Sequence, residues 1–203
     1  GRVVFLKDVL DEAKNRARSV VLSKLQDKST HRTSFAREEI SEQEVEDIAE
    51  AVGVGAVIYS DLGQGRERNI KFDWDEALSL EGNSSPYIQY AHARTKSILR
   101  NAQDRGIAID REIKPVFAGK YEKELVKHLS LFPRAIARAL ERNQPSTVAE
   151  YALAATDIFN KFYGEVRVLA EEDPQKRNTR LRLTQATSQV IANSLFLLGI
   201  KAP

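Results

Sequence analysis

Two tyrosines and one arginine lie at helical spacing in the segment SPYIQYAHARTKSIL, residues 85–99. Tyr87 and Tyr90 are three residues apart, and Arg94 follows four residues later. A helix turns by about 100° per residue, so these side chains form a stripe that flanks the apolar face of the helix. Tyrosine in that position can stack its ring on a nucleic-acid base and keep its hydroxyl in water. Arginine beside it can reach a phosphate or stack on a base.

The same stripe also has two other interpretations. Tyrosines beside an apolar face can simply seal the edge of a helix bundle, with the hydroxyl at the surface. Tyrosine and arginine are also favoured at the energetic centre of protein interfaces, so a helical protein–protein interaction module is a rival hypothesis. The spacing alone leaves all three open.

The other candidates for chemistry are better explained as structure. The segment GVGAV, residues 53–57, lacks the spacing of a dinucleotide-binding loop and the lysine of a phosphate-binding loop. Asp73 and Asp75 form a carboxylate pair, but the start of a helix explains them more simply. There is no cysteine, and the three histidines are scattered, so we predict no metal site and no catalytic residue.

The composition of the chain argues against a membrane protein and a secreted protein. No apolar run approaches the roughly 18 residues of a membrane-spanning helix, and the first residues do not form a signal peptide. We therefore expect a cytoplasmic protein without a membrane partner. Methionine is absent even at position 1, so we expect a fragment of a longer protein.

The charge is distributed unevenly along the chain. Residues 1–85 contain 12 Lys and Arg against 17 Asp and Glu, whereas residues 86–203 contain 19 against 12. The second half therefore has a net charge of +7, which makes it a candidate for binding nucleic acid.

Residues 1–80 are predicted to form a small mixed β/α unit. Short strands are expected at residues 2–6 and 70–72, with loops at residues 26–40 and 63–69. Gly53 is expected to end a helix, with a further short helix after it. Three pairs have the spacing of a capping box and should start helices: Asp8 with Asp11, Ser41 with Glu44, and Asp73 with Glu76.

Residues 86–203 are predicted to form an α-helical bundle, because apolar residues recur there at helical spacing. Pro133 should kink or split one helix, since proline lacks an N–H group and clashes with the preceding turn. Thr147 and Glu150 have capping-box spacing, and Asp173 and Pro174 should start a last helix that ends at Gly199. The predicted fold class is mainly α, a β/α unit followed by a helical bundle.

Three segments resemble the C-terminal part of arginyl-tRNA synthetases. The first is VGVGAVIYSDLGQGRERNIKFDWDEALSLEGNSSPYIQYAHARTKSILRNA, residues 52–102. The resemblance resumes at FNKFYGEVRVL, residues 159–169, and at TRLRLTQATSQVIANSLFLLGIKAP, residues 179–203. It covers nearly the whole chain in the right order, and AHAR stands where the anticodon-binding bundle of the family has its naming motif.

The resemblance implies part of a class I ligase that joins arginine to its tRNA through an arginyl-adenylate. It implies a stem-contact fold at residues 1–80 and an anticodon-binding domain at residues 86–203. The HIGH and KMSKS motifs of the catalytic domain are absent, so the chain alone is expected to be inactive. The cofactor ATP, with Mg²⁺, and the substrate arginine would serve the parent enzyme and not this fragment. The implied partner is arginine tRNA, bound by a monomer.

The resemblance also implies which residues contact the tRNA. Tyr87, Tyr90, Tyr163 and Arg180 match positions that contact the anticodon loop, and we add Arg94 from the stripe. Arg66 and Arg68, in the turn of the first unit, would contact the tRNA body. Single-stranded bases stack on aromatic rings in this kind of recognition. We therefore predict one aromatic platform formed by the three tyrosines, with Arg94 and Arg180 nearby.

Overall fold

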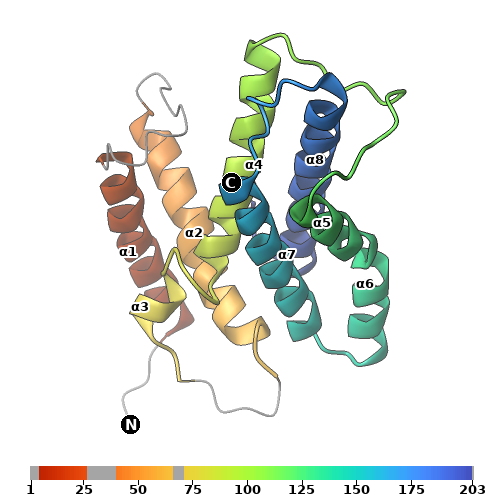
Figure 1. The fold of residues 1–203 in the computed structure, drawn as a ribbon. Coiled ribbons are helices and arrows are strands. Elements are labelled where there is room, and N and C mark those ends of the chain that lie inside the picture. The colour runs from red at the N-terminus through yellow and green to blue at the C-terminus, as the bar shows by residue number, and fades with distance from the viewer. Residues whose placement is uncertain (1–4, 27–39, 66–70, 203) are drawn as a thin grey trace.

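The computed structural model describes residues 5–26, 40–65 and 71–202, and it shows a helical protein (Figure 1). The predicted fold class, mainly α, is confirmed. The described residues contain no strand, so the β part of the predicted first unit is wrong as far as it is described. The helices are α1 (Leu6–Gln26), α2 (Glu42–Leu62), α3 (Trp74–Ala77), α4 (Ser85–Asp104), α5 (Lys120–Ser130), α6 (Phe132–Glu141), α7 (Ser146–Glu165) and α8 (Pro174–Leu197).

Neither predicted strand is present in the part of the chain that the structure describes. Leu6 is already the first residue of α1, so Asp8 lies in its first turn and is not the N-cap; residues 2–4 lie outside the described part. Lys71 and Phe72 lie in an irregular segment, and residue 70 is not described. A strand needs a neighbouring strand for its backbone hydrogen bonds, and none is found in the described ranges. Phe72 instead packs edge-on against Trp74, with 4.7 Å between ring centroids.

Polar side chains start three helices as their spacing predicts. The Ser41 hydroxyl accepts a hydrogen bond from the Glu44 amide, and the Ser41 amide donates to the Glu44 carboxylate, which completes a capping box before α2. Asp73 accepts hydrogen bonds from the amides of residues 75 and 76 before α3. Asp173 caps α8 in the same way, with Pro174 as the first helical residue. Each motif is local, so sequence suffices to find it.

Proline divides the second half as expected, but one predicted cap is wrong. α5 ends at Ser130, and α6 begins at Phe132 with Pro133 in its first turn. α7, however, begins at Ser146, before the predicted cap at Thr147, and no side chain caps it. The turn after Pro145 starts the helix instead, because the amide of Val148 donates to the Pro145 carbonyl.

Gly53 does not end α2, which runs unbroken through it to Leu62. The glycine lies where α1 and α2 touch. A Cβ atom on Gly53 would lie 2.6 Å from the backbone carbonyl carbon of Ala13, closer than packed atoms approach. The predicted helix end is therefore wrong, because this glycine serves close helix packing.

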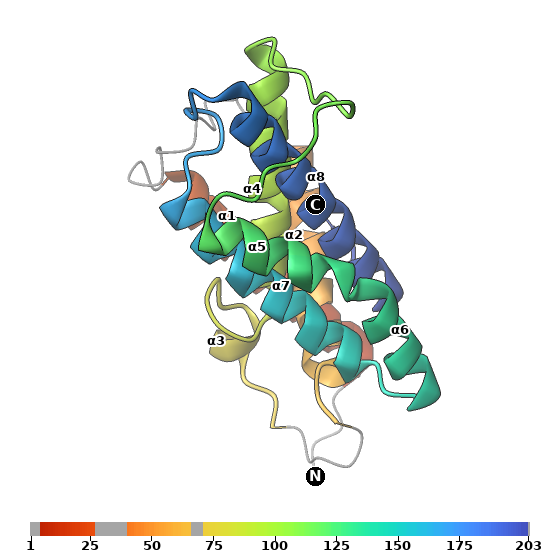
Figure 2. The ribbon, with the colours of Figure 1, turned by 45° about the vertical axis from the view of Figure 1, so that its right-hand side comes forward.

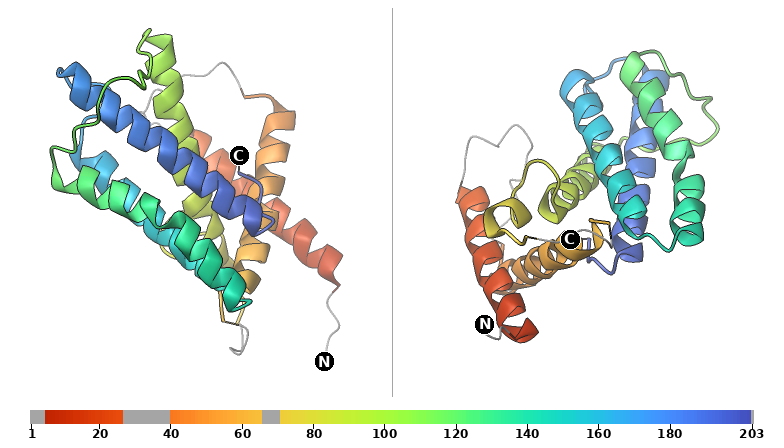
Figure 3. Two further views of the ribbon diagram at one scale, coloured as in Figure 1. Left: turned by 90° about the vertical axis from the view of Figure 1, so that its right-hand side faces the viewer. Right: turned by 90° about the horizontal axis from the view of Figure 1, so that it is seen from below.

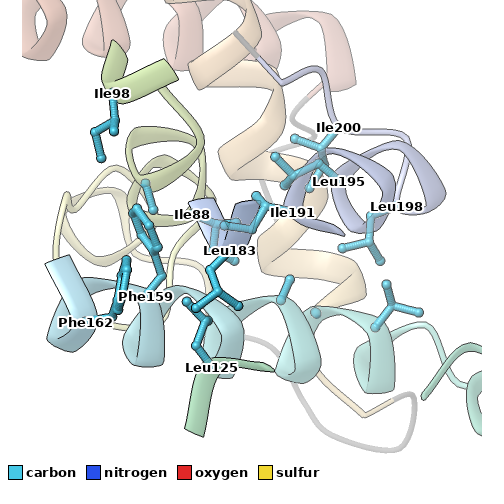
Figure 4. Packing of buried hydrophobic residues seen from close by; sticks show 14 of the residues in the cluster. Ile88, Ile98, Leu125, Phe159, Phe162, Leu183, Ile191, Leu195, Leu198 and Ile200 are labelled. Atoms are coloured by element: carbon cyan, nitrogen blue, oxygen red, sulfur yellow. The ribbon is translucent and has the colours of Figure 1, made fainter. Parts of the chain in front are cut away.

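The helices form consecutive layers. α1 and α2 are an antiparallel pair at one side, α4 lies beside α2, and α7 and α8 pack on α4 (Figures 1 and 3). α5 and α6 pack on α7 on the side away from α1 and α2 (Figure 2). The main core lies between α4, α7 and α8, where Ile88, Phe159 and Ile191 are fully buried (Figure 4). α2 contributes Tyr59 to this core, and a smaller cluster around Ala17 and Val52 joins α1, α2 and α3. The proposed boundary between residues 80 and 86 stays a prediction.

The irregular segment 105–119 is held on α8 by side-chain hydrogen bonds. The Asn178 amide group bonds both the N–H and the carbonyl of Asp110, at 2.9 and 2.7 Å. The Thr179 hydroxyl accepts from the Val116 amide at 2.9 Å. Asn178 and Thr179 are buried, so the first turns of α8 fix this long segment in one place.

Candidate nucleic-acid interface

The packing of α4 against α7 brings the predicted tyrosines together. Tyr87 and Tyr90 lie on the first half of α4, and Tyr163 lies near the end of α7. Phe159 and Phe162 of α7 are fully buried and fix the orientation of that helix, which leaves Tyr163 half-buried at the edge of the core. The prediction that the tyrosines flank the core is therefore confirmed for all three, since each is partly exposed.

Arg94 lies between two of these rings. Its guanidinium carbon is 4.8 Å from the centre of the Tyr90 ring and 5.1 Å from the centre of the Tyr163 ring. Each contact of this type contributes roughly 0.5–1 kcal/mol at an exposed site and more where water is excluded. A base that stacks on Tyr90 or Tyr163 has at most the ring face that Arg94 does not occupy.

Asn160 of α7 joins Arg94 to the third tyrosine. Its side-chain oxygen accepts a hydrogen bond from Arg94 Nη1 at 2.6 Å, and its side-chain nitrogen donates to the Tyr87 hydroxyl at 2.9 Å. The Tyr87 hydroxyl in turn donates to Asp157 at 2.9 Å. Partial burial raises the pKa of Tyr87 above its ordinary value, so the hydroxyl keeps its proton at neutral pH. We call these residues the α4–α7 cluster: Tyr87, Tyr90, Arg94, Asp157, Asn160 and Tyr163.

Sequence reasoning missed Asn160 and Asp157. The signal was present, because Asp157, Asn160 and Tyr163 follow one another at three-residue spacing on α7 and so share a face. Asn160 lies inside the FNKFY motif, in which only the tyrosine was singled out. Asn160 contacts Arg94 because α4 packs against α7. The two residues are 66 positions apart, and spacing within one helix cannot predict such a contact.

Arg180 lies in a separate network. Its side chain forms ion pairs with Glu122, at 3.1 Å, and with Glu171, and it donates to the carbonyl of Arg167 at 2.9 Å. The three tyrosines are not among its hydrogen-bond or ion-pair partners in the described structure. The Arg180 side chain is 13% exposed and that of Glu122 only 3%, so two carboxylates neutralise a guanidinium that is nearly buried. The predicted contact between Arg180 and RNA stays a prediction.

The carboxylate of Glu171 holds this network to the start of α8. The Asp173 amide donates a hydrogen bond to it, and Arg180 and Lys176 lie nearby. The hydrogen bond first, and then the positive charges, hold the pKa of Glu171 below its ordinary value. Arg66 and Arg68, the predicted contacts to the tRNA body, lie outside the described residues.

The described residues also bear on metal binding and on membrane association. They contain no group of three or more histidines, cysteines or carboxylates that could hold a metal ion. None of the helices they form has the length and apolar character required to cross a membrane.

Comparisons with known proteins place the chain among tRNA synthetases. Residues 88–203 match the family model of the DALR anticodon binding domain, and residues 1–74 match that of the class I (R) tRNA synthetase catalytic domain. An arginine–tRNA ligase of Chloroflexus aggregans is 41% identical over 203 residues, which are 100% of this chain and 33% of the relative. One from Clostridium perfringens is 37% identical, covering 98% of this chain and 33% of the relative. The chain thus spans about a third of the length of the curated relatives it matches.

Solved structures give the same result. Thermus thermophilus arginyl-tRNA synthetase superposes with a TM-score of 0.82 at 33% identity, over 99% of this chain and 32% of that protein. The Plasmodium falciparum arginyl-tRNA synthetase superposes with a TM-score of 0.81 at 25% identity, over 99% of this chain and 33% of that protein.

Proposed function

The chain belongs to the DALR anticodon-binding domain family, and on that premise we propose that it binds the anticodon loop of arginine tRNA as part of an arginine–tRNA ligase. The α4–α7 cluster is the proposed contact surface. The observation that carries this proposal is the position of Arg94, held between Tyr90 and Tyr163 and hydrogen-bonded to Asn160. The comparisons do not favour the rival hypothesis, a helical protein–protein interaction module.

The chemistry of the cluster fits an RNA loop. Arg94 has no ion-pair partner among the described side chains, so its positive charge is free to attract phosphates. The tyrosine rings are half-buried and held in fixed places, and fixed aromatic rings bind unpaired bases by stacking. Carboxylates repel phosphates, so Asp157 would keep the backbone away from Tyr87 and towards Arg94.

The whole enzyme, in this proposal, joins arginine to its tRNA using ATP and Mg²⁺. Arginine and ATP are substrates of that reaction, and we assign none of their contacts to this chain. Residues 1–80 would contact the tRNA body, through Arg66 and Arg68, and the protein would work as a cytoplasmic monomer. The chain by itself should not activate arginine. Turnover above background in an ATP–pyrophosphate exchange assay would contradict this expectation.

Binding and stability measured on the same variants test the proposal. Tyr90→Ala removes a stacking surface and one cation–π contact, so the affinity for an arginine tRNA transcript should fall by about 1–3 kcal/mol. Its effect on the free energy of unfolding should stay below the ~3–5 kcal/mol of a truncated core aromatic. Phe162→Ala is the matched core control, because Phe162 is fully buried. If Tyr90→Ala and Tyr163→Ala leave binding unchanged but unfold like Phe162→Ala, the tyrosines only seal the bundle.

A further inference from the structure

Three arginines form a row along α6 and its C-cap residue, away from the α4–α7 cluster. Arg134, Arg138 and Arg142 follow at four-residue spacing, so they lie on one side of the helix and span about 12 Å of it. All three are exposed, and none has an ion-pair partner in the ranges that the structure describes. We call these three residues the α6 arginine row.

The row borders a hollow of about 790 Å³ between α5, α6 and α7. Leu131, Ala135 and Tyr151 provide apolar surface in it, and the His128 ring stacks on Tyr151 with 4.4 Å between centroids. Two carboxylates, Glu141 and Glu150, also border the hollow. Glu150 lies on α7, but Glu141 is the last residue of α6 and lies on the same side as the arginines. The three arginines outnumber these two carboxylates, so the hollow keeps a net positive charge along α6.

We propose that the α6 arginine row binds the phosphate backbone of RNA, as a second contact beyond the anticodon-loop surface. This inference rests on the proposed function, because it takes the same RNA as its ligand. Guanidinium groups pair with phosphates through two parallel hydrogen bonds, and a straight row of them follows a sugar–phosphate strand without reading its sequence.

The surroundings of the row favour a phosphate strand over a protein. Protein interfaces depend on exposed apolar or aromatic anchors at their centre. The more exposed leucine of this region, Leu140, lies about 200° around the helix from Arg138, on the other side from the row. Leu131, 42% exposed, is the large exposed apolar residue on the side of the row. Tyr151 is 8% exposed and so offers a partner little surface. The charged groups that reach solvent along the row are three guanidinium groups and the Glu141 carboxylate, and their net positive charge suits an anionic polymer.

Both proposed surfaces use residues of α7. The hollow uses Tyr151 of α7, and the α4–α7 cluster uses Asn160, nine residues and about 13 Å further along the helix. The two residues also face different sides of α7, since nine residues turn the helix by about 180°. An RNA stem beside the loop that contacts Arg94 would have to pass around α7 to meet the row.

A charge-removal variant of the 203-residue chain tests the row. The triple variant R134Q/R138Q/R142Q should weaken binding to an arginine tRNA transcript and to an unrelated tRNA alike. Each phosphate contact adds about 0.7–0.9 to the slope of log affinity against log salt, so the variant should flatten that slope by about 2 to 3. R134K/R138K/R142K keeps the charge and should keep most of the slope. The double variant E141Q/E150Q should tighten binding, since it removes the nearby negative charge.

Controls separate this inference from the proposed function. R105Q/R111Q/K114Q removes the same charge from exposed positions in segment 105–119, outside both proposed surfaces, and should flatten the slope less than the row variant does. Equal denaturation midpoints for wild type and variants show that the fold is intact. If Y90A weakens binding and R134Q/R138Q/R142Q leaves both affinity and slope unchanged, the row is a solvated surface and the proposed function stands. If the wild-type chain binds no tRNA, both proposals fail together.

Discussion

Replacing Asn160 by alanine should break the hydrogen bonds that join Arg94 to Tyr87 and leave the apolar core intact. The change removes one hydrogen bond to the charged Arg94 and one to the neutral Tyr87 hydroxyl. Hydrogen bonds to charged groups contribute about 1.5–3 kcal/mol and neutral ones about 0.5–1.5. Arg94 is partly exposed and Tyr87 keeps its bond to Asp157, so water and Asp157 offset part of the loss. We expect the free energy of unfolding to fall by about 1.5–2.5 kcal/mol.

The assay is chemical denaturation combined with tRNA binding, on N160A, Y87F and the double variant. Y87F keeps the ring and removes the hydroxyl, so it breaks the bond to Asn160 from the other side. These variants form a double-mutant cycle. Because Asn160 and Tyr87 share a hydrogen bond, their effects on the free energy of unfolding should differ from additivity by roughly 0.5–1.5 kcal/mol. RNA affinity should also fall in N160A, because Arg94 is no longer held between the rings. The connection of Arg94 to Tyr87 through Asn160 would be refuted if N160A lowered the free energy of unfolding by less than about 0.5 kcal/mol and the effects of N160A and Y87F were strictly additive.

Three shorter predictions concern the scaffold. Gly53→Ala should destabilise the chain by about 1–3 kcal/mol because its Cβ would strike the α1 backbone, whereas Gly164→Ala, with nothing within 4 Å of its Cβ, should be neutral or stabilising in the same urea titration. Arg180→Met should cost about 3–5 kcal/mol because it leaves Glu122 charged and buried, and adding Glu122→Leu should recover much of that loss. Burial lowers the pKa of His128 below 6.5; the unfolded chain then takes up the proton first, so stability should fall as pH drops from about 7 towards 5, and less so in His128→Gln.

Local chemistry explains what the sequence predicts well. Ser41, Asp73 and Asp173 accept hydrogen bonds from amides two or three residues ahead, so the motif and its partner lie in one short segment. Pro133 interrupts a helix for an equally local reason, its missing N–H group. The stripe of Tyr87, too, was predictable, because the position of a residue around a helix depends only on its spacing.

The features that sequence reasoning missed depend on contacts between distant segments. Glycine is common at helix ends, so Gly53 was predicted to end a helix. The structure instead requires glycine there because the backbone of Ala13, 40 residues away, leaves no room for a Cβ atom. The partners of Arg180 include Glu122, 58 residues away on α5. No helical periodicity encodes either contact, so the sequence predicted a helix end at Gly53 and gave no protein partner for Arg180.

Arg94 and Arg180 show why residue type alone does not define an RNA contact. Both are predicted tRNA contacts, and both are partly buried. Arg180 faces Glu122 and Glu171, and two carboxylates cancel its charge at the surface. Arg94 instead faces two tyrosine rings and a neutral amide, which hold the guanidinium in place and leave its net charge uncompensated. The salt dependence of RNA binding should therefore decrease when Arg94 is replaced by methionine. In Arg180→Met it should stay close to that of the wild type under conditions where the variant is folded, because a charge already neutralised releases few counterions.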